Sequence, residues 1–181
     1  RMIHMGLGRS FQITNIFPNL SAFENIRLAT QSMRGDNFSF LKNTSKIEGC
    51  DERSWEVLKQ VGLLEKAAVP GRFLAHGDQR KLELGMILAP DPEVLLLDEP
   101  TAGMASEQVP ELIELIRGIQ AEGSKTVLLV EHNMNVVMEN ADFITVMNHG
   151  EVLAEGVPAE IANNHDVQTA YLGGLYEIDI A

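Results

Sequence analysis

The chain has 181 residues and a formal net charge of −12; 45% of its residues are hydrophobic and 22% are charged. This composition is typical of a folded globular protein and excludes a disordered chain, a collagen-like repeat and a coiled-coil rod. The acidic charge makes nucleic acid a poor candidate as a partner. Residues 1–90 carry a net charge of +3 and residues 91–181 one of −15, which indicates two regions with different partners.

The cysteine count and the apolar runs limit the class of protein further. Cys50 is the single cysteine, which excludes an internal disulfide framework and a cysteine-cluster zinc site and fits a reducing compartment. No unbroken apolar run is longer than the stretch Val94 to Leu97, which is far shorter than the roughly 20 residues that span a bilayer. Because Arg1 is not an initiator residue, we expect the chain to be a piece of a longer protein.

Helical patterns dominate the first half of the chain. After a lead-in that we expect to be extended over residues 9–13, Ser21 and Glu24 have the spacing of a capping box. In this motif the serine and glutamate side chains both accept hydrogen bonds from backbone N–H groups at the start of a helix. The spacing of apolar residues predicts two more helices. The three predicted helices run from Ser21 to about residue 33, over residues 52–62, and up to residue 88.

Strands and helices alternate in the second half. Residues 94–98 and 126–130 are short apolar runs, as in the buried strands of a parallel sheet. A helix is expected between them over residues 107–122, and this alternation predicts an α/β fold. Residues 148–150, Asn-His-Gly, predict a hairpin turn. The remaining predicted elements are a helix over residues 134–139, hairpin strands over residues 143–147 and 151–154, and helices over residues 158–163 and 166–172.

Two adjacent carboxylates, Asp98 and Glu99, follow the first of these strands. The carboxyl ends of parallel strands are where α/β folds bind ligands. At a phosphoryl-transfer site the first carboxylate can hold Mg²⁺, while the second orients or deprotonates the attacking water. The pair by itself equally fits a helix N-cap or two solvated loop acids.

Glu131 and His132 follow the second strand in the same way. A histidine at this place can contact a γ-phosphate, although a single loop histidine is more often an ordinary surface residue. Because two strands of one sheet both end in polar pairs, a phosphate site is better supported than it would be by either pair alone.

Two further segments carry candidate ligand groups. Residues 74–80, Leu-Ala-His-Gly-Asp-Gln-Arg, place a glycine at a predicted helix start, where backbone N–H groups bind anions. Asp78 suits the helix dipole there, but it would repel a phosphate if its side chain pointed at it. An ordinary helix start explains the segment equally well. Gln12, which follows Phe11, is unremarkable by itself.

In this order, the segments resemble the nucleotide-binding domain of ATP-binding cassette (ABC) transporters, and the resemblance covers nearly the whole chain. Its most specific part is the combination of a signature, a Walker B strand and a switch histidine. Gln12 matches the Q-loop glutamine, residues 74–80 the signature, residues 94–99 Walker B with its catalytic glutamate, residues 101–104 the D-loop, and His132 the switch histidine.

The resemblance implies a P-loop NTPase fold of the α/β class, a RecA-like parallel sheet with an inserted helical subdomain, truncated at its N-terminus. Residues 1–181 then form a single, partial ABC ATPase domain. Its implied parts are a Q-loop lead-in (residues 1–13), a helical subdomain with the signature (14–92), and a catalytic sheet lobe with C-terminal helices (93–181).

Several segments look like the ATPases of branched-chain amino acid importers. Similar proteins import urea or short amides, so the resemblance specifies the family more firmly than the substrate. The segments are residues 8–12, Gly-Arg-Ser-Phe-Gln; residues 16–25, Ile-Phe-Pro-Asn-Leu-Ser-Ala-Phe-Glu-Asn; residues 76–80, His-Gly-Asp-Gln-Arg; and residues 100–104, Pro-Thr-Ala-Gly-Met.

Three features depart from the family pattern. No Gly-x-x-x-x-Gly-Lys-Ser/Thr segment occurs in the chain; the family places this phosphate-binding loop before the Q-loop, so we expect it before Arg1 and expect the chain alone to be inactive. Ala75 replaces the signature serine, whose hydroxyl would contact a γ-phosphate, which predicts weakened rather than abolished activity. Ala105 stands where many members have a polar D-loop residue.

The resemblance implies ATP as substrate and Mg²⁺ as cofactor, with ATP bound between two subunits of a head-to-tail dimer. Glu99 is implied to polarise the attacking water and His132 to contact the γ-phosphate. Gln12 and Asp98 are the implied Mg²⁺ ligands. The implied nucleotide-binding residues are Gln12, Asp98, Ala75, His76, Gly77, Asp78 and Gln79.

The resemblance also implies partners and a location. The function would be that of an ATP-hydrolysing importer subunit, for branched-chain or related amino acids, on the cytoplasmic face of the cell membrane. Its partners would be a second ABC ATPase subunit, identical or different, and transmembrane permease subunits, with a periplasmic or extracellular substrate-binding protein acting indirectly.

Two other functions stay open from the sequence. The missing phosphate-binding loop and Ala75 also fit a truncated or non-catalytic subunit that docks on a permease or a catalytic partner. A P-loop ATPase of DNA repair shares the signature and Walker B, although the net charge of −12 and the importer-like segments argue against it.

Overall fold

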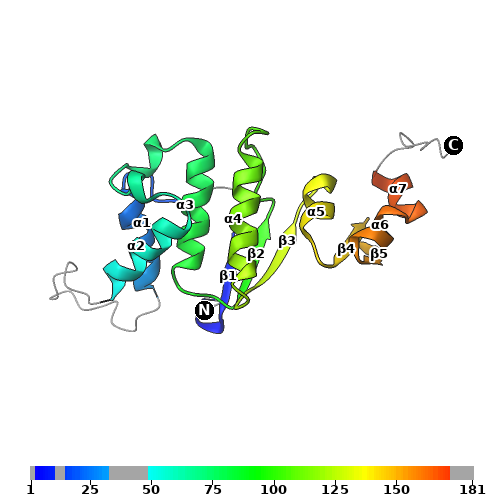
Figure 1. Ribbon diagram of the computed structural model, residues 1–181, viewed down its shortest axis with the longest axis horizontal. Coiled ribbons are helices and arrows are strands. Elements are labelled where there is room, and N and C mark those ends of the chain that lie inside the picture. The colour runs from blue at the N-terminus through cyan, green and yellow to red at the C-terminus, as the bar shows by residue number, and fades with distance from the viewer. Residues whose placement is uncertain (1–2, 11–14, 33–48, 172–181) are drawn as a thin grey trace. The chain divides into compact units, whose positions relative to one another are not determined.

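The computed structural model describes residues 3–10, 15–32 and 49–171 of the chain (Figure 1). The chain divides into two compact units, Arg1–Glu131 and His132–Ala181. The division into lead-in, helical subdomain and sheet lobe stays a prediction. Within the described ranges, no helix is both long and apolar enough to cross a membrane.

The first unit contains a three-stranded parallel sheet in the order β1-β2-β3. After the short helix η1 (Ile3–Met5), β1 (Leu7–Arg9) pairs with β2 (Val94–Asp98), which pairs in turn with β3 (Thr126–Val130). The helix α4 (Val109–Ala121) connects β2 to β3. The predicted strands 94–98 and 126–130 are confirmed, as is the predicted α/β class.

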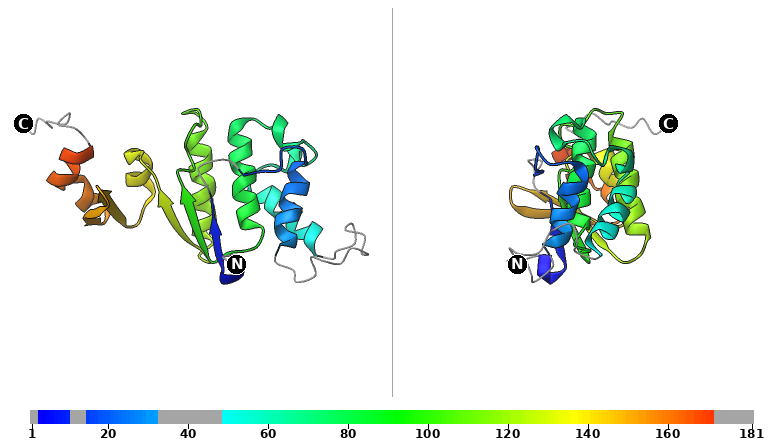
Figure 2. Two further views of the ribbon diagram at one scale, coloured as in Figure 1. Left: turned by 180° about the vertical axis from the view of Figure 1, so that it is seen from behind. Right: turned by 90° about the vertical axis from the view of Figure 1, so that its left-hand side faces the viewer.

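The two faces of this sheet differ. Leu95 and Leu97 of β2 are buried, and α4 lies against one face of the sheet (Figure 2). On the other face Leu128 and Val130 of β3 are 58% and 54% exposed. Alternation along a strand explains the contrast, because neighbouring residues point to opposite faces. Among the described residues, α4 covers one face of the sheet, and the face that carries Leu128 and Val130 is exposed.

Three helices pack beside the sheet in the first unit (Figures 1 and 2). They are α1 (Ala22–Gln31), α2 (Cys50–Gln60) and α3 (His76–Leu88), with the short helices η3 (Leu64–Lys66) and η4 (Gly71–Phe73) between α2 and α3. The predicted capping box is confirmed: Glu24 N–H donates to Ser21 Oγ at 3.2 Å, and Ser21 N–H donates to Glu24 Oε2 at 2.9 Å. All three helices lie within about two residues of their predicted positions.

A close approach of α3 to the sheet depends on Gly8 of β1. A Cβ atom at this position would lie 2.6 Å from Cγ2 of Ile87 and 3.0 Å from Cγ of Pro92. Real Cβ atoms do not approach neighbours so closely, so a larger residue would push α3 away. The glycine thus allows α3 to pack directly on β1.

The second unit is built on the antiparallel pair β4 (Ile144–Asn148) and β5 (Glu151–Gly156). The turn between them is His149-Gly150, with φ of 50° and 84°, as a two-residue hairpin turn requires. The helices α5 (Met134–Asn140), α6 (Pro158–Ala162) and α7 (His165–Tyr171) complete the unit. Its buried core consists of Ile144, Val146, Ile161 and Val167.

Candidate functional site

The candidate site begins where β2 ends. The backbone N–H of Asp98 donates to Ser10 Oγ at 2.9 Å, and the N–H of Ser10 donates to the carbonyl of Leu96 at 2.9 Å. Ser10 directly follows β1 and is buried. The residue after the first strand therefore fixes the backbone at the end of the second, and places Asp98 at the carboxyl edge of the parallel sheet.

Glu99 follows in an unusual backbone conformation. Its φ is 44°, in the left-handed region that non-glycine residues seldom occupy. Its N–H donates to the carbonyl of Val130 at 2.8 Å, and its own carbonyl accepts from the N–H of Ala102 at 3.0 Å. Such strain persists where the surroundings over-determine the backbone, and it concentrates at functional sites. The sharp bend redirects the chain directly after the strand.

Residues 98–104, which we name the strand-end turn, are anchored to the end of β3 by Glu131. Glu131 Oε1 accepts hydrogen bonds from Oγ1 of Thr101 at 2.6 Å and from its backbone N–H at 3.1 Å. Thr101 is buried, with 7% exposure. Hydrogen bonds to a carboxylate are stronger than those between neutral groups. This contact therefore stabilises the position of the strand-end turn relative to the end of β3.

A second anchor joins the strand-end turn to α3. Arg80 Nη2 donates to the carbonyl of Ala102 at 3.3 Å, and its Nη1 lies 3.1 Å from Glu83 Oε2. The side chains of both charged residues are only 7% exposed. Arg80 thus connects the helix that begins at the candidate signature to the turn that carries the candidate catalytic glutamate.

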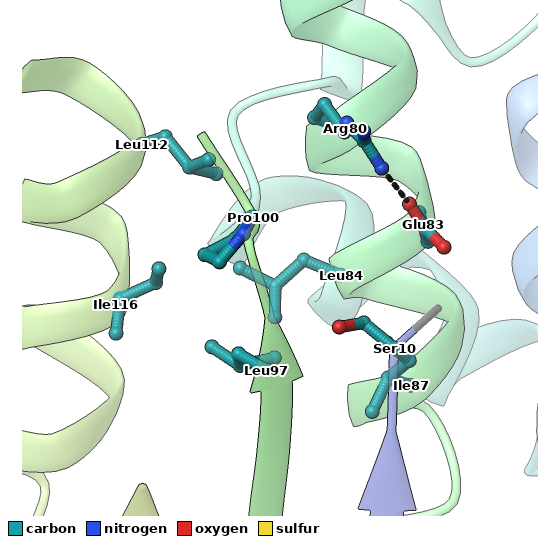
Figure 3. Close-up of a pocket in the computed structure, with 9 residues that line it drawn as sticks. All are labelled: Ser10, Arg80, Glu83, Leu84, Ile87, Leu97, Pro100, Leu112 and Ile116. Atoms are coloured by element: carbon teal, nitrogen blue, oxygen red, sulfur yellow. Dashed lines mark hydrogen bonds and ion pairs between the residues drawn. The ribbon is translucent and has the colours of Figure 1, made fainter. Parts of the chain in front are cut away.

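A cavity of about 20 Å³ lies beneath this contact (Figure 3). This volume is enough for about one water molecule and far too small for a nucleotide. Its lining is mostly apolar, so the cavity belongs to the packing between α3, α4 and β2. The lining residues are Ser10, Arg80, Glu83, Leu84, Ile87, Leu97, Pro100, Leu112 and Ile116.

The candidate signature, residues 74–80, forms the start of α3. Ala75 is the N-cap residue and provides no side-chain hydrogen bond to the helix. Ala75 and His76 are exposed, whereas Leu74 and Gly77 are buried. The first two predicted nucleotide-binding positions of this segment therefore lie on the surface, at the positive end of a helix dipole.

The next two residues of the segment are held by the protein itself. Asp78 Oδ2 lies 2.5 Å from Nζ of Lys66, and the hydrogen bond and charge of Asp78 raise the pKa of Lys66 above its usual value. Gln79 Nε2 donates to the carbonyls of Leu74 at 3.0 Å and Gly71 at 3.2 Å. Both side chains thus stabilise the segment, and the Asp78 carboxylate has a cationic partner.

Similarity to known proteins decides the family. Residues 1–102 match the family described as ABC transporter. The chain belongs to the ABC transporter family. Residues 151–176 also match the family described as branched-chain amino acid ATP-binding cassette transporter, so matches cover both ends of this ABC chain.

Curated ABC relatives are similar over almost the whole chain. The high-affinity branched-chain amino acid transport ATP-binding protein LivG is 39% identical over 178 residues in Salmonella typhimurium and in Escherichia coli. The protein BraF of Pseudomonas aeruginosa, which carries the same description, is 36% identical over 178 residues. These alignments cover 96% of this chain and 70% of each relative.

Solved ABC structures confirm the predicted P-loop NTPase fold. The ADP conformation of MJ1267, an ATP-binding cassette of an ABC transporter, has a TM-score of 0.78 at 22% identity and is matched over 70% of its length. The structure of cbiO1 from Clostridium perfringens, part of the transporter complex cbiONQ, has a TM-score of 0.74 at 24% identity. The chain spans 64% of the length of cbiO1.

The structure brings together only part of the predicted ABC site. Asp98 and Glu99 lie at the carboxyl edge of the sheet, and Ala75, His76 and Gly77 lie at the start of α3. Gln12 lies outside the described residues. His132 is the first residue of the second unit and is exposed.

The donor chemistry at the end of β2 fits Mg²⁺. Carboxylate oxygen is the ligand that this ion prefers, and Mg²⁺ is commonly held by one or two carboxylates together with water and substrate phosphates. No group of three or more His, Cys, Asp or Glu side chains that could hold a metal occurs in the described part of the chain. Asp98 therefore offers the kind of donor that could hold Mg²⁺ together with substrate phosphates and water.

Three residues that hold the strand-end turn were not assigned a role from the sequence. In the sequence Glu131 stands out only as one of the polar pair after the second strand, Arg80 only as the last residue of the signature, and Ser10 only as part of an importer-like segment. A local pattern gives little signal for such roles, because each depends on a partner far away in the sequence. For Glu131, its place directly after a buried strand was the one available indication.

Proposed function

We propose that the complete protein is the ATP-hydrolysing subunit of an ABC importer for branched-chain or related amino acids. The observation that carries this proposal is the 39% identity, over 178 residues, to LivG proteins described as branched-chain amino acid transport ATP-binding proteins. The match of residues 151–176 to a family described in the same terms supports the substrate class. The strand-end position of Asp98 and Glu99 supports ATP hydrolysis.

In this proposal the carboxylates at the end of β2 perform the chemistry. Glu99 polarises the attacking water, and Asp98, with Gln12, holds Mg²⁺ at the nucleotide. Mg²⁺, when bound, neutralises charge that develops on the phosphate oxygens. The left-handed backbone of Glu99 and its two backbone hydrogen bonds orient this residue before substrate arrives, as preorganised catalysis requires.

His132 and the signature complete the proposed site. His132 contacts the γ-phosphate, and residues 75–79 act on a nucleotide held by a second ABC subunit. Exposure of Ala75 and His76 supports an outward-facing role for the signature. The bonds of Asp78 and Gln79 within the chain support indirect roles for these two residues, which keep the exposed positions in shape.

The proposed partners follow from the importer function. They are a second ABC ATPase subunit and transmembrane permease subunits, which would place the protein on the cytoplasmic face of the membrane. The proposal concerns a protein that contains a phosphate-binding loop, since none occurs within residues 1–181; these residues by themselves are expected not to hydrolyse ATP.

Glu99→Gln in the complete protein tests the proposal. Removing a general base lowers turnover by about a hundredfold or more, while ATP affinity should change little because the amide keeps the size of the carboxylate. Steady-state turnover and equilibrium binding of ATP measure the two effects. Glu52→Gln, which changes an exposed carboxylate of α2, serves as the control and should leave turnover as in the wild type.

Two outcomes would contradict the proposal. Unchanged turnover in Glu99→Gln would remove the role of Glu99. ATP binding without any hydrolysis by the wild-type protein would favour the non-catalytic docking subunit instead. Uptake of labelled leucine, isoleucine and valine by the reconstituted transporter tests the substrate class separately.

A further inference from the structure

The side chain of Glu131 connects the two strand ends that carry the proposed catalytic groups. We propose that Glu131 and Thr101 are positioning residues that hold Glu99 in its hydrolytic orientation. This inference rests on the proposed function, because it concerns how the same site reaches its working geometry.

The contact is specific in its geometry. A single carboxylate oxygen, Glu131 Oε1, accepts both the hydroxyl of Thr101 at 2.6 Å and its backbone N–H at 3.1 Å. The two donors belong to one residue, so the contact fixes both the side chain of Thr101 and the path of the backbone. Thr101 is also buried, and water therefore competes poorly for its hydroxyl.

Two successive residues of one strand end hold two positions of the strand-end turn. The carbonyl of Val130 accepts the N–H of Glu99 at 2.8 Å, and Glu131 binds Thr101 two residues later. These bonds lie on either side of the strained φ of Glu99. Loss of the second bond would let the turn relax towards an ordinary backbone conformation.

The second carboxylate oxygen of Glu131, Oε2, is buried and makes no further hydrogen bond in the described part of the chain. Withdrawing a carboxylate oxygen from water is costly unless hydrogen bonds elsewhere on the group offset the lost hydration. Among the described residues this carboxylate hydrogen-bonds Thr101, which supports a positioning role over incidental packing.

The expected kinetic effect follows from the sensitivity of catalysis to geometry. A misplacement of about 1 Å in a catalytic group costs as much as a hundredfold in rate. Substrate binding, in contrast, depends on the phosphate-binding elements and not on the orientation of Glu99. A positioning role therefore predicts a change in kcat with little change in KM.

A pair of variants at Thr101 tests this prediction in the complete protein. Thr101→Val keeps the shape of the side chain and removes the hydroxyl, and it should lower kcat about tenfold while KM for ATP stays within about twofold. Thr101→Ser retains the hydroxyl and should keep kcat within about twofold of the wild type. Glu131→Ala should lower kcat at least as much, and the double variant should not be much worse than Glu131→Ala alone.

The second unit supplies a matched control. Oγ1 of Thr145 on β4 donates to Glu155 Oε1 of β5 at 2.9 Å, and both residues are exposed. Thr145→Val removes a hydrogen bond of the same chemical type in which no residue of the strand-end turn takes part. It should leave kcat unchanged.

Several results would overturn the inference. One is a kcat of Thr101→Val equal to that of the wild type; another is a joint loss of kcat and ATP binding that a lower folded fraction explains. A wild-type protein that does not hydrolyse ATP, or a fully active Glu99→Gln variant, would instead refute the proposed function. The two failures are therefore distinguishable in one set of measurements.

Discussion

The strand-end turn and the candidate signature are organised in opposite ways. Residues 98–104 are held by partners from three directions: Ser10, Arg80 and Glu131. In the signature the exposed residues are Ala75 and His76, of which the first gives the helix no side-chain cap. One region is thus fixed by buried and charged hydrogen bonds, while the other presents an open helix start.

The difference fits the different tasks that the two regions would have in ATP hydrolysis. A catalytic carboxylate must be oriented before the reaction, so strong anchors suit the strand-end turn. A surface that meets a nucleotide on another subunit must stay accessible. The contacts that keep it rigid must therefore come from residues that face the interior of its own unit. Asp78 and Gln79 provide this rigidity, because both side chains bind neighbouring segments of the same unit.

The largest expected effect comes from breaking the link between the two regions. Arg80→Met removes the guanidinium that binds Ala102 and leaves Glu83 buried without this cation. Removing one partner of a buried ion pair costs about 3 kcal/mol or more, so the free energy of unfolding from urea denaturation should fall by about that amount.

Arg117→Met is the matched control for this prediction. Arg117 lies 3.2 Å from Glu114 on α4, but both side chains are largely exposed. Exposed pairs contribute roughly 0–1 kcal/mol, so this variant should unfold almost as the wild type does. Equal losses in the two variants would show that Arg80 does not join the regions.

A smaller gain in stability is expected when the start of α3 receives the side-chain hydrogen bond that it lacks. Ala75 has the extended backbone of an N-cap residue, with φ −61° and ψ 155°, but no side-chain acceptor. Ala75→Ser should add the missing cap and raise the free energy of unfolding by about 1 kcal/mol. Thermal or urea unfolding without nucleotide measures this effect independently of catalysis.

Ala75→Val is the control for the cap, because valine adds bulk without a hydrogen-bond acceptor. It should bring no gain in stability. If the serine variant is no more stable than the valine variant, the free backbone N–H groups at the start of α3 already have other hydrogen-bond acceptors.

The smallest expected effect concerns the ion pair between Lys66 and Asp78 of the signature. Asp78 raises the pKa of Lys66, so the pair stabilises the folded state below the ordinary pKa of lysine. This contribution is lost as the pH rises through the higher pKa of the folded state. Lys66 is 49% exposed, so solvent screening limits the stability loss in Lys66→Met to a few tenths of a kcal/mol at about pH 8.

Urea denaturation at two pH values measures this contribution. The difference between Lys66→Met and the wild type should be larger at about pH 8 than at a pH well above the ordinary lysine pKa of about 10.4, where the ammonium loses its charge. A difference that grows with pH would contradict the assigned direction of the pKa shift.

Local patterns were enough to predict most elements of the fold. The strands over residues 94–98 and 126–130 and the capping box of Ser21 and Glu24 occur as predicted, because each depends on residues close together in the sequence. Helix ends deviate from the prediction: α2 begins at Cys50 and not at residue 52. Its N-cap, Gly49, has a left-handed backbone and no side-chain cap, and therefore gives no sequence signal of a start.

The sequence by itself determined the family, the α/β class and the two strand-end pairs that carry the candidate chemistry. Only the tertiary structure decided what the neighbouring polar side chains do. Asp78 binds Lys66 across 12 positions, Arg80 binds Ala102 across 22, and Thr101 binds Glu131 across 30. The physical reason is that a hydrogen bond depends on distance and direction in space, and for these pairs the packing of strands and helices sets both.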